Sequence, residues 1–460
     1  MRTNNRWVIA IAGVFFQVAL GPVYAWSVFR VPLAKQFGWS ISEITLTFTI
    51  SIFVLGIAAF FGGLWLNRKG PRVVALTGGA LYGLGAFLAS FSHDLWWLYL
   101  SYGVVGGIGL GLGYIVPVAV LVKWFPDRRG LITGIAVGGF GAGALITAPV
   151  ATRLIQNAGV LSTFAYLGIA YLIVTAITGL FMQNPPDGWK PEGWMPTATQ
   201  TSHRANRDFT LAEALKTWQW WALWLILFLN TCAGISIISQ EAPLFQEEAG
   251  VTAAVAASMV GLASIGNAAG RVFWAWVSDL ITRRATFFVM FAGQVLLFWL
   301  LPNIATVSFL AIVTFVVLMC YGGGFGTMPA FAADYFGPKN VGPIYGLMLT
   351  AWGFASAFGP CSSRICAKQL VHIAARFISS PVSWRSQHCC RSWCIHREHA
   401  TPAKAARYRT FAQRRVTNRS RLLNRANNSW YDMKVTIFTT SLIAASLFLS
   451  HGSISSETLV

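Results

Sequence analysis

The chain has 460 residues, of which 55% are hydrophobic and 11% charged, and it contains 44 glycines. This balance excludes an ordinary soluble globular domain and predicts a membrane protein. The net charge of +19 does not indicate a nucleic-acid partner, because residues 1–360 hold 19 basic and 12 acidic side chains, whereas residues 361–460 hold 15 and 3.

Apolar stretches long enough to cross a hydrocarbon core, roughly 20 residues each, occur eleven times in the chain, and Arg271 is the only charged residue within them. They cover residues 7–29, 44–66, 73–92, 95–122, 131–152, 160–182, 218–240, 251–278, 285–301, 304–333 and 341–360. The proline-containing segment 183–217 between the sixth and seventh stretches reads as a linker, in which Thr210 and Glu213 predict a capped surface helix. We therefore predict an N-terminal six-helix half (1–182), a cytoplasmic linker (183–217) and a C-terminal half (218–360) with helices 7–11.

The basic residues indicate the orientation in the membrane, because short cytoplasmic loops retain Lys and Arg. Three basic residues, Arg30, Lys35 and Arg153, fall at one set of predicted helix ends. Fifteen fall at the other set: Arg2, Arg6, Arg68, Lys69, Arg72, Lys123, Arg128, Arg129, Lys190, Arg204, Arg207, Lys216, Arg283, Arg284 and Lys339. The sequence predicts a multi-pass protein of the inner (plasma) membrane with a cytoplasmic N-terminus. The first apolar stretch is too long for a cleaved signal peptide and should remain as helix 1.

The two halves repeat each other at an offset of about 212 residues. Asn67 corresponds to Asp279, and the register continues as far as Pro149 and Pro360. A membrane chain built from two parallel copies is typical of a transporter whose halves rock around a central site. The basic loops at these positions predict gating residues that hold the cytoplasmic side closed. Alternatively, these residues only enforce the topology. The group consists of Asn67, Arg68, Arg72, Asp279, Arg283 and Arg284. The Asn67 group should be the weaker, because asparagine carries no charge.

Arg271 lies about two turns inside the eighth apolar stretch, which is otherwise free of charge. A guanidinium in hydrocarbon costs several kcal/mol, so it must face a polar cavity or a partner. No Asp or Glu occurs at comparable depth in any predicted span. We therefore expect an anionic ligand, since the planar guanidinium fits a carboxylate through two hydrogen bonds. The alternative is a structural arginine held by helix carbonyls and Asn267.

Four motifs carry a family resemblance: Gly21–Phe29 in helix 1, Lys123–Gly130 after helix 4, Gly270–Asp279 in helix 8 and Tyr345–Gly353 in helix 11. Residues 1–360 resemble the major facilitator superfamily and, within it, the oxalate/formate antiporter family. The resemblance implies an all-α membrane protein of the major facilitator fold, with two pseudo-symmetric six-helix halves of which helix 12 is missing or altered here. It also implies an aromatic cage around a carboxylate, at Tyr24, Tyr114, Phe140, Tyr321 and Phe325.

This chain departs from the oxalate carrier of that family, which has a lysine at the position of Trp352 and glutamines at those of Val23 and Ile52. One cation remains instead of two, so one carboxylate of oxalate would lack a charged partner. We predict a monocarboxylate of the formate, lactate or pyruvate type, with Trp352 covering an apolar substituent. An oxalate or dicarboxylate antiporter is the alternative.

Other functions are less consistent with the chain. The spans lack a mid-depth carboxylate or histidine, which favours exchange or facilitated diffusion over proton symport. An enzyme would need a nucleophile, an acid–base pair or a metal set, and we expect no enzyme activity, cofactor or metal. We expect a monomer in the lipid bilayer whose partner is a small organic anion. A carboxylate sensor that does not transport and an inactive gene product remain open.

The tail, residues 361–460, breaks with the preceding pattern. Five of the seven cysteines and four of the seven histidines fall within its first forty or so residues, in spacings that do not match a structural zinc site. No apolar stretch reappears before residues 435–449, which are short for a span. Since the repeat ends at Pro360, we interpret the basic tail as out-of-frame sequence that replaces helix 12.

Overall fold

The computed structural model describes residues 5–358, except 187, 194, 196–206, 249 and 301–305. The elements in these ranges are helical, and no strand occurs among them. Seven described helices are long and apolar enough to cross a membrane. The predicted out-of-frame tail, with its cysteines and histidines, lies outside the described residues, as does the end of the eleventh span.

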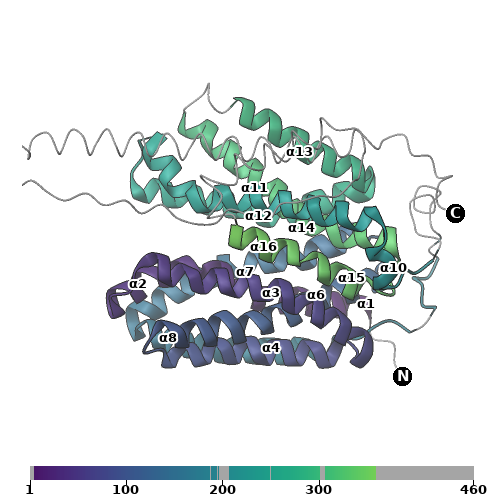
Figure 1. Ribbon diagram of the computed structural model, residues 1–460, viewed down its shortest axis with the longest axis horizontal. Coiled ribbons are helices and arrows are strands. Elements are labelled where there is room, and N and C mark those ends of the chain that lie inside the picture. Colours follow the sequence, from purple (N-terminus) through teal and green to yellow (C-terminus); the bar gives the residue numbers. More distant parts are fainter. Residues whose placement is uncertain are drawn as a thin grey trace, which may run out of the picture.

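The first half is a bundle of long helices, drawn in purple and blue in Figure 1. Two of its spans change helix type along their length, since a 3-10 segment divides the first and a π-helix lies near the start of the fourth, after one short α-helix. The elements are α1 (Arg6–Leu20), the 3-10 helix η1 (Gly21–Trp26), α2 (Ser27–Phe37), α3 (Ile41–Lys69), α4 (Pro71–Leu88), η2 (Ala89–Phe91), α5 (Leu95–Leu98), the π-helix η3 (Tyr99–Gly106), α6 (Gly107–Trp124), α7 (Arg129–Ala158) and α8 (Val160–Gly179).

The second half lies against the first, in teal and green in Figure 1. The linker forms the predicted short helix α10, where the Thr210 hydroxyl accepts from the Glu213 amide and the Glu213 carboxylate accepts from the Thr210 amide. The elements are α10 (Leu211–Leu215), α11 (Trp218–Glu248), α12 (Ala253–Leu280), α13 (Arg283–Leu300), α14 (Val307–Phe336), α15 (Val341–Met348) and α16 (Thr350–Phe358).

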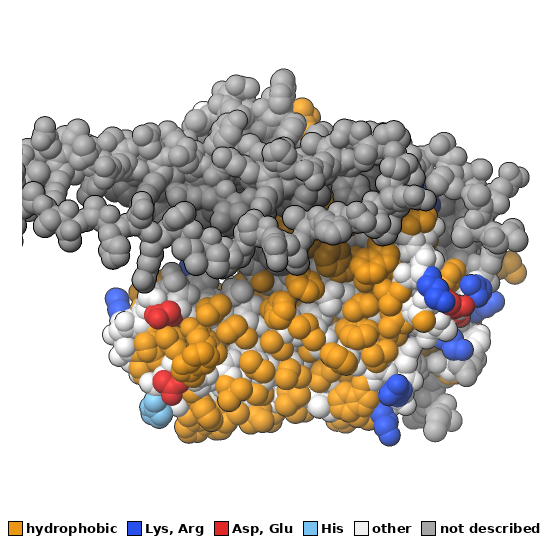
Figure 2. Space-filling view, viewed as in Figure 1, with side chains coloured by type: hydrophobic (Ala, Val, Ile, Leu, Met, Phe, Trp, Pro, Cys, Tyr) orange, Lys and Arg blue, Asp and Glu red, His pale blue; other side chains and the backbone are white. Residues whose placement is uncertain are grey.

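On the face drawn in Figure 2, an apolar surface covers the middle of the described part, and charged side chains gather toward its two ends. Large hydrophobic residues of both halves are exposed, among them Phe15, Phe61, Ile177 and Ile312. A soluble protein rarely exposes so much contiguous apolar surface. This apolar surface is the kind that a multi-pass membrane protein presents. We name the end that carries residues 67–72, 125–131, 279–284 and 334–340 the latch end.

Glycines allow the two halves to approach closely. A Cβ on Gly134 of α7 would lie 2.5 Å from the Arg271 carbonyl oxygen of α12, so a larger residue would push these helices apart. Gly63 of α3 lies against Gly342 of α15 in the same manner. Small residues at such contacts are the usual way in which membrane helices pack. The contacts bring α7 and α12, and α3 and α15, together across the interface between the halves.

Candidate functional site

Arg271 is completely buried at the interface between the halves. Its guanidinium donates hydrogen bonds to Asn267 Oδ1 (3.3 Å) on its own helix, to the Val137 carbonyl oxygen (3.2 Å) of α7 and to the Tyr24 hydroxyl (3.4 Å) of η1. No Asp or Glu forms an ion pair with it in the described part of the chain. Two of its three acceptors belong to the first half, so this one side chain joins the two halves.

The hydrogen bonds of Arg271 leave its charge incompletely satisfied. All three are longer than the 2.7–2.9 Å or so of a typical charge-assisted bond. Arginine has five N–H donors, and only three find acceptors among the described residues. The carbonyl and Asn267 contacts are those expected of a structurally held arginine. The unused N–H on each terminal nitrogen can still bind an anion.

The six predicted aromatic residues lie together beside Arg271. Trp352 of α16 is the centre of the group, with its ring 4.8 Å from that of Phe325 and 5.8 Å from that of Tyr114. Phe140 makes edge contacts with Tyr24 (5.3 Å) and Tyr114 (5.2 Å). We name this group the aromatic cage: Tyr24, Tyr114, Phe140, Tyr321, Phe325 and Trp352.

The aromatic cage surrounds the guanidinium with ring faces. The Arg271 Cζ atom lies 5.4 Å from the Phe325 ring centre, 5.8 Å from that of Phe140 and 5.9 Å from that of Tyr24. Such contacts stabilise a desolvated cation without neutralising it. Tyr24 is half-buried. The other five rings of the cage are nearly inaccessible to solvent.

Breaks in two helices place Tyr24 and Trp352 in the aromatic cage. Tyr24 belongs to the 3-10 segment η1, which contains Pro22 near its start. Gly21, at the beginning of η1, lies against the Phe140 carbonyl oxygen of α7, where any side chain would collide. Trp352 follows a second break, between α15 and α16 at Leu349. The first break places the Tyr24 ring near Arg271, and the second places the Trp352 ring against those of Phe325 and Tyr114.

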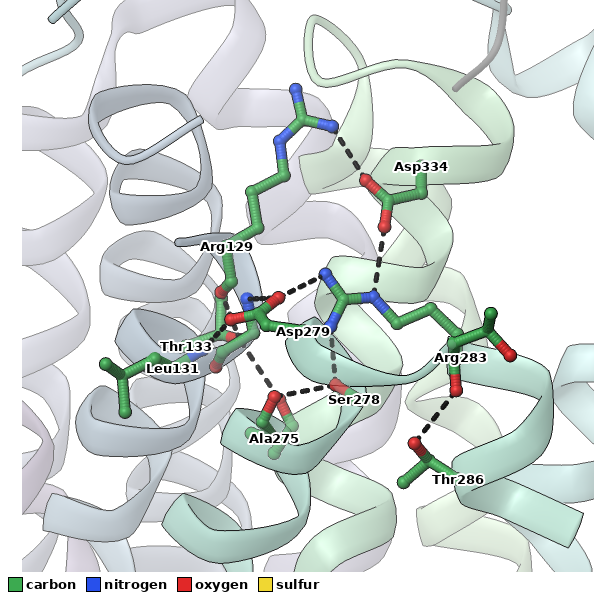
Figure 3. A network of polar contacts seen from close by, with 12 residues as sticks. Arg129, Leu131, Thr133, Ala275, Ser278, Asp279, Arg283, Thr286 and Asp334 are labelled. Carbon is green, nitrogen blue, oxygen red and sulfur yellow. Dashed lines mark hydrogen bonds and ion pairs between the residues drawn. The ribbon is translucent and has the colours of Figure 1, made fainter. Parts of the chain in front are cut away.

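A charged cluster closes the interface at the latch end (Figure 3). Asp279 pairs with Arg283 (2.7 Å) and accepts from the Gly130 and Leu131 amides at the start of α7. A carboxylate is stabilised there by the unpaired amides and the dipole of the helix. Asp334 then bonds both Arg283 (3.0 Å) and Arg129 (2.8 Å). We name Arg129, Asp279, Arg283 and Asp334 the latch cluster.

The corresponding contact of the first half carries no charge. The Asn67 side chain donates to Asn340 Oδ1 (3.0 Å), and the Asn340 amide donates to the Phe209 carbonyl oxygen of the linker (2.7 Å). Arg68 and Arg72 are exposed and form no ion pair with any described residue. The structure therefore brings Asn67 to the interface between the halves and leaves these two arginines at the surface.

Arg284 bonds the Tyr335 hydroxyl, which belongs to the same half. This contact ties α13 to α14 and does not cross between the halves. Of the six predicted gating residues, Asn67 and Asp279 bond the opposite half directly, and Arg283 reaches it through Asp279 and Asp334.

A profile of the Major Facilitator Superfamily matches residues 7–360. The chain belongs to this superfamily. It is 31% identical over 359 residues to the uncharacterized MFS-type transporter YhjX of Escherichia coli (strain K12), a match that covers 77% of this chain and 86% of that protein. It is 27% identical over 360 residues to the oxalate:formate antiporter of Oxalobacter formigenes, covering 77% and 84%. The solved structure of the proton:xylose symporter XylE is similar with a TM-score of 0.63 at 12% identity, covering 97% of this chain and 95% of that one.

These comparisons confirm the predicted family and the all-α fold of this superfamily member. Sequence reasoning nevertheless missed Arg129 and Asp334 as members of the latch cluster. At the 212-residue offset they correspond to Val341 and Val122, so the internal repeat carried no signal for them. The Arg128-Arg129-Gly130 motif offered a clue to Arg129 alone. Tyr345 was also missed, although it stands in one of the motifs.

Proposed function

We propose that this protein is a secondary transporter of small carboxylates that works by alternating access. The observation that carries the proposal is Arg271, a fully buried cation with unused donors that lies between the halves. A carboxylate can accept two parallel hydrogen bonds from a guanidinium and neutralise it. The similarity to an oxalate:formate antiporter supports the same class of substrate.

A monocarboxylate fits the aromatic cage better than a dicarboxylate. Arg271 supplies the only charge beside the six rings in the described part of the chain, and Trp352 supplies apolar area in place of a second cation. A second carboxylate in this dry site would lose its hydration without gaining a charged partner, which costs several kcal/mol. The substrates we propose are of the formate, lactate or pyruvate type.

Substrate binding is coupled to rocking through the bonds that Arg271 makes to the first half. A bound carboxylate takes the unused donors and neutralises the guanidinium, which weakens its bonds to the Val137 carbonyl and the Tyr24 hydroxyl. Weakening of these two bonds loosens the connection between the halves at Arg271, while the latch cluster and Asn67 hold the halves together at the latch end. A ligand shifts such an equilibrium only through its different affinity for the two states. The halves then exchange access between the two sides of the membrane, by exchange or facilitated diffusion.

The latch end is the cytoplasmic end in this proposal, because it carries most of the basic side chains. The protein is then a multi-pass monomer of the inner (plasma) membrane whose N-terminus is cytoplasmic. Residues 1–182 and 218–360 act as the rocking halves, and the linker connects them on the cytoplasmic side.

Counterflow into liposomes with labelled monocarboxylates and dicarboxylates tests the proposal. We expect uptake of monocarboxylates, its loss in Arg271→Ala and a small residue of activity in Arg271→Lys, which keeps the charge but not the planar donors. Arg153→Ala serves as the control, because it removes an exposed arginine from the opposite end. Preference for oxalate would contradict the monocarboxylate proposal. Binding without flux would identify a sensor, and neither binding nor flux would indicate an inactive product.

A further inference from the structure

Two buried tyrosine hydroxyls, one in the aromatic cage and one beside it, find no hydrogen-bond partner among the described residues other than each other. Tyr114 of α6 and Tyr345 of α15 are both 0% exposed. Their hydroxyls lie next to each other, one from each half, close enough to interact as a pair, and neither meets hydrogen-bond geometry with any other described residue. A phenol has one O–H, so even a bond within the pair leaves one buried O–H without an acceptor. Buried polar groups normally have partners, so this pair requires an explanation.

These hydroxyls lie at the depth of the predicted carboxylate site. The 212-residue repeat makes Ala59 of the first half the counterpart of Arg271, so Ala59 marks the same depth in the bundle. Gly346, the residue after Tyr345, packs against Ala59, because a Cβ on Gly346 would lie 2.5 Å from the Ala59 carbonyl oxygen. Tyr114 contacts Phe140 (5.2 Å) and Trp352 (5.8 Å), and Phe140 is one of the rings against Arg271. The Arg271 guanidinium acts electrostatically on both hydroxyls.

The chemistry of this arrangement is complementary to a carboxylate with a neighbouring oxygen. Arg271 offers N–H donors to the carboxylate, and two neutral O–H groups lie beyond it. A phenol donates one hydrogen bond and accepts others, so it suits a hydroxyl or a carbonyl oxygen. A purely apolar substituent would leave at least one phenol O–H without an acceptor, and a second carboxylate would keep an uncompensated charge.

We propose that Tyr114 and Tyr345 select monocarboxylates that carry a hydroxyl or keto oxygen on the carbon next to the carboxylate. The proposal rests on carboxylate transport by this chain and narrows its substrates to 2-hydroxy and 2-oxo acids. Formate and simple fatty acids then bind more weakly, because they cannot satisfy the two phenols. Sites built around a substrate hydroxyl discriminate strongly against analogues that lack it.

Three substrates of nearly equal size test the proposal with the full chain in liposomes: lactate, pyruvate and propionate, which lacks the second oxygen. We expect lactate and pyruvate to be exchanged at least about tenfold more efficiently than propionate. Tyr114→Phe and Tyr345→Phe should each lower lactate and pyruvate transport by a much larger factor than propionate transport, so that the preference disappears. Tyr82→Phe is the matched control, because its buried hydroxyl likewise has only a neighbouring tyrosine, Tyr102, as a partner, and its ring stacks on Tyr171 within the first half.

Quenching of tryptophan fluorescence by the same three acids measures binding in detergent and separates selectivity from flux. Equal transport of propionate and lactate by the unmodified chain would overturn this proposal and leave carboxylate transport intact. So would an equal loss of both substrates in the two variants, or the same loss in Tyr82→Phe. If the unmodified chain preferred oxalate and the two variants abolished that preference, the phenols would bind a second carboxylate. That outcome would also overturn this proposal. If none of the acids binds, the proposed transport function itself fails.

Discussion

Replacing Asp334 with asparagine tests whether the latch cluster holds the halves together. The two carboxylate oxygens of Asp334 accept from Arg129 at 2.8 Å and from Arg283 at 3.0 Å, and the three side chains are only 8–15% exposed. The Asp334→Asn side chain keeps one acceptor oxygen and replaces the other with a donor. It therefore loses one bond and leaves Arg129 without a charged partner.

The size of this effect follows from the burial of the cluster. Removing one partner of a fully buried pair costs about 3–5 kcal/mol. The pairs retain some solvent contact, and Arg283 keeps Asp279, so we reduce the estimate to about 2 kcal/mol. This energy stabilises only the state in which the latch end is closed. Its loss shifts the ratio of closed to open molecules by roughly 30-fold.

Cross-linking between Asn67→Cys and Asn340→Cys measures closure at a contact outside the cluster. These side chains are hydrogen-bonded in the closed latch end, so a short thiol-specific cross-linker should join them in that state. We expect Asp334→Asn to slow cross-linking strongly. Asp94→Asn is the control, because Asp94 caps α5 at the opposite end of the molecule. An unchanged cross-linking rate in Asp334→Asn would refute the role of the cluster in closing the interface.

Three further outcomes are expected. Asn340→Ala should lower the free energy of unfolding by about 1–2 kcal/mol, because the Asn67 side chain and the Phe209 carbonyl both lose their partner. Thermal melting in detergent measures this loss. An unchanged melting temperature would contradict the prediction. The Thr210 amide and hydroxyl hold the pKa of Glu213 below its usual value of 4.5, so the ionised carboxylate stabilises α10 above that value and the contribution is lost as pH falls through the lowered pKa. Linker proteolysis should rise over that acidic range with an acid-active protease, and Glu213→Gln should abolish the step. Finally, one of the other two reading frames of the gene beyond Pro360 should encode an apolar segment of about twenty residues, and its absence from both frames would refute the interpretation of the tail.

The sequence alone was sufficient to predict the family and the helices, and it singled out Arg271 as a charge within a span. Spans are local features, since about twenty apolar residues must form a helix in hydrocarbon to satisfy their own backbone. A charged side chain inside such a span is conspicuous because hydrocarbon does not solvate it. The cap formed by Thr210 and Glu213 was also predictable, because a capping box involves residues only three apart.

Only the tertiary structure decided which groups meet across the interface between the halves. The Val137 carbonyl and the Tyr24 hydroxyl reach Arg271 across 134 and 247 residues of sequence, and nothing in a helical periodicity specifies such partners. Arg129 and Asp334 escaped prediction because their contact depends on the side of the bundle that each helix presents. The buried pair of Tyr114 and Tyr345, which lacks a further acceptor among the described residues, is likewise a property of packing, since a hydroxyl is unsatisfied only once its neighbours are fixed.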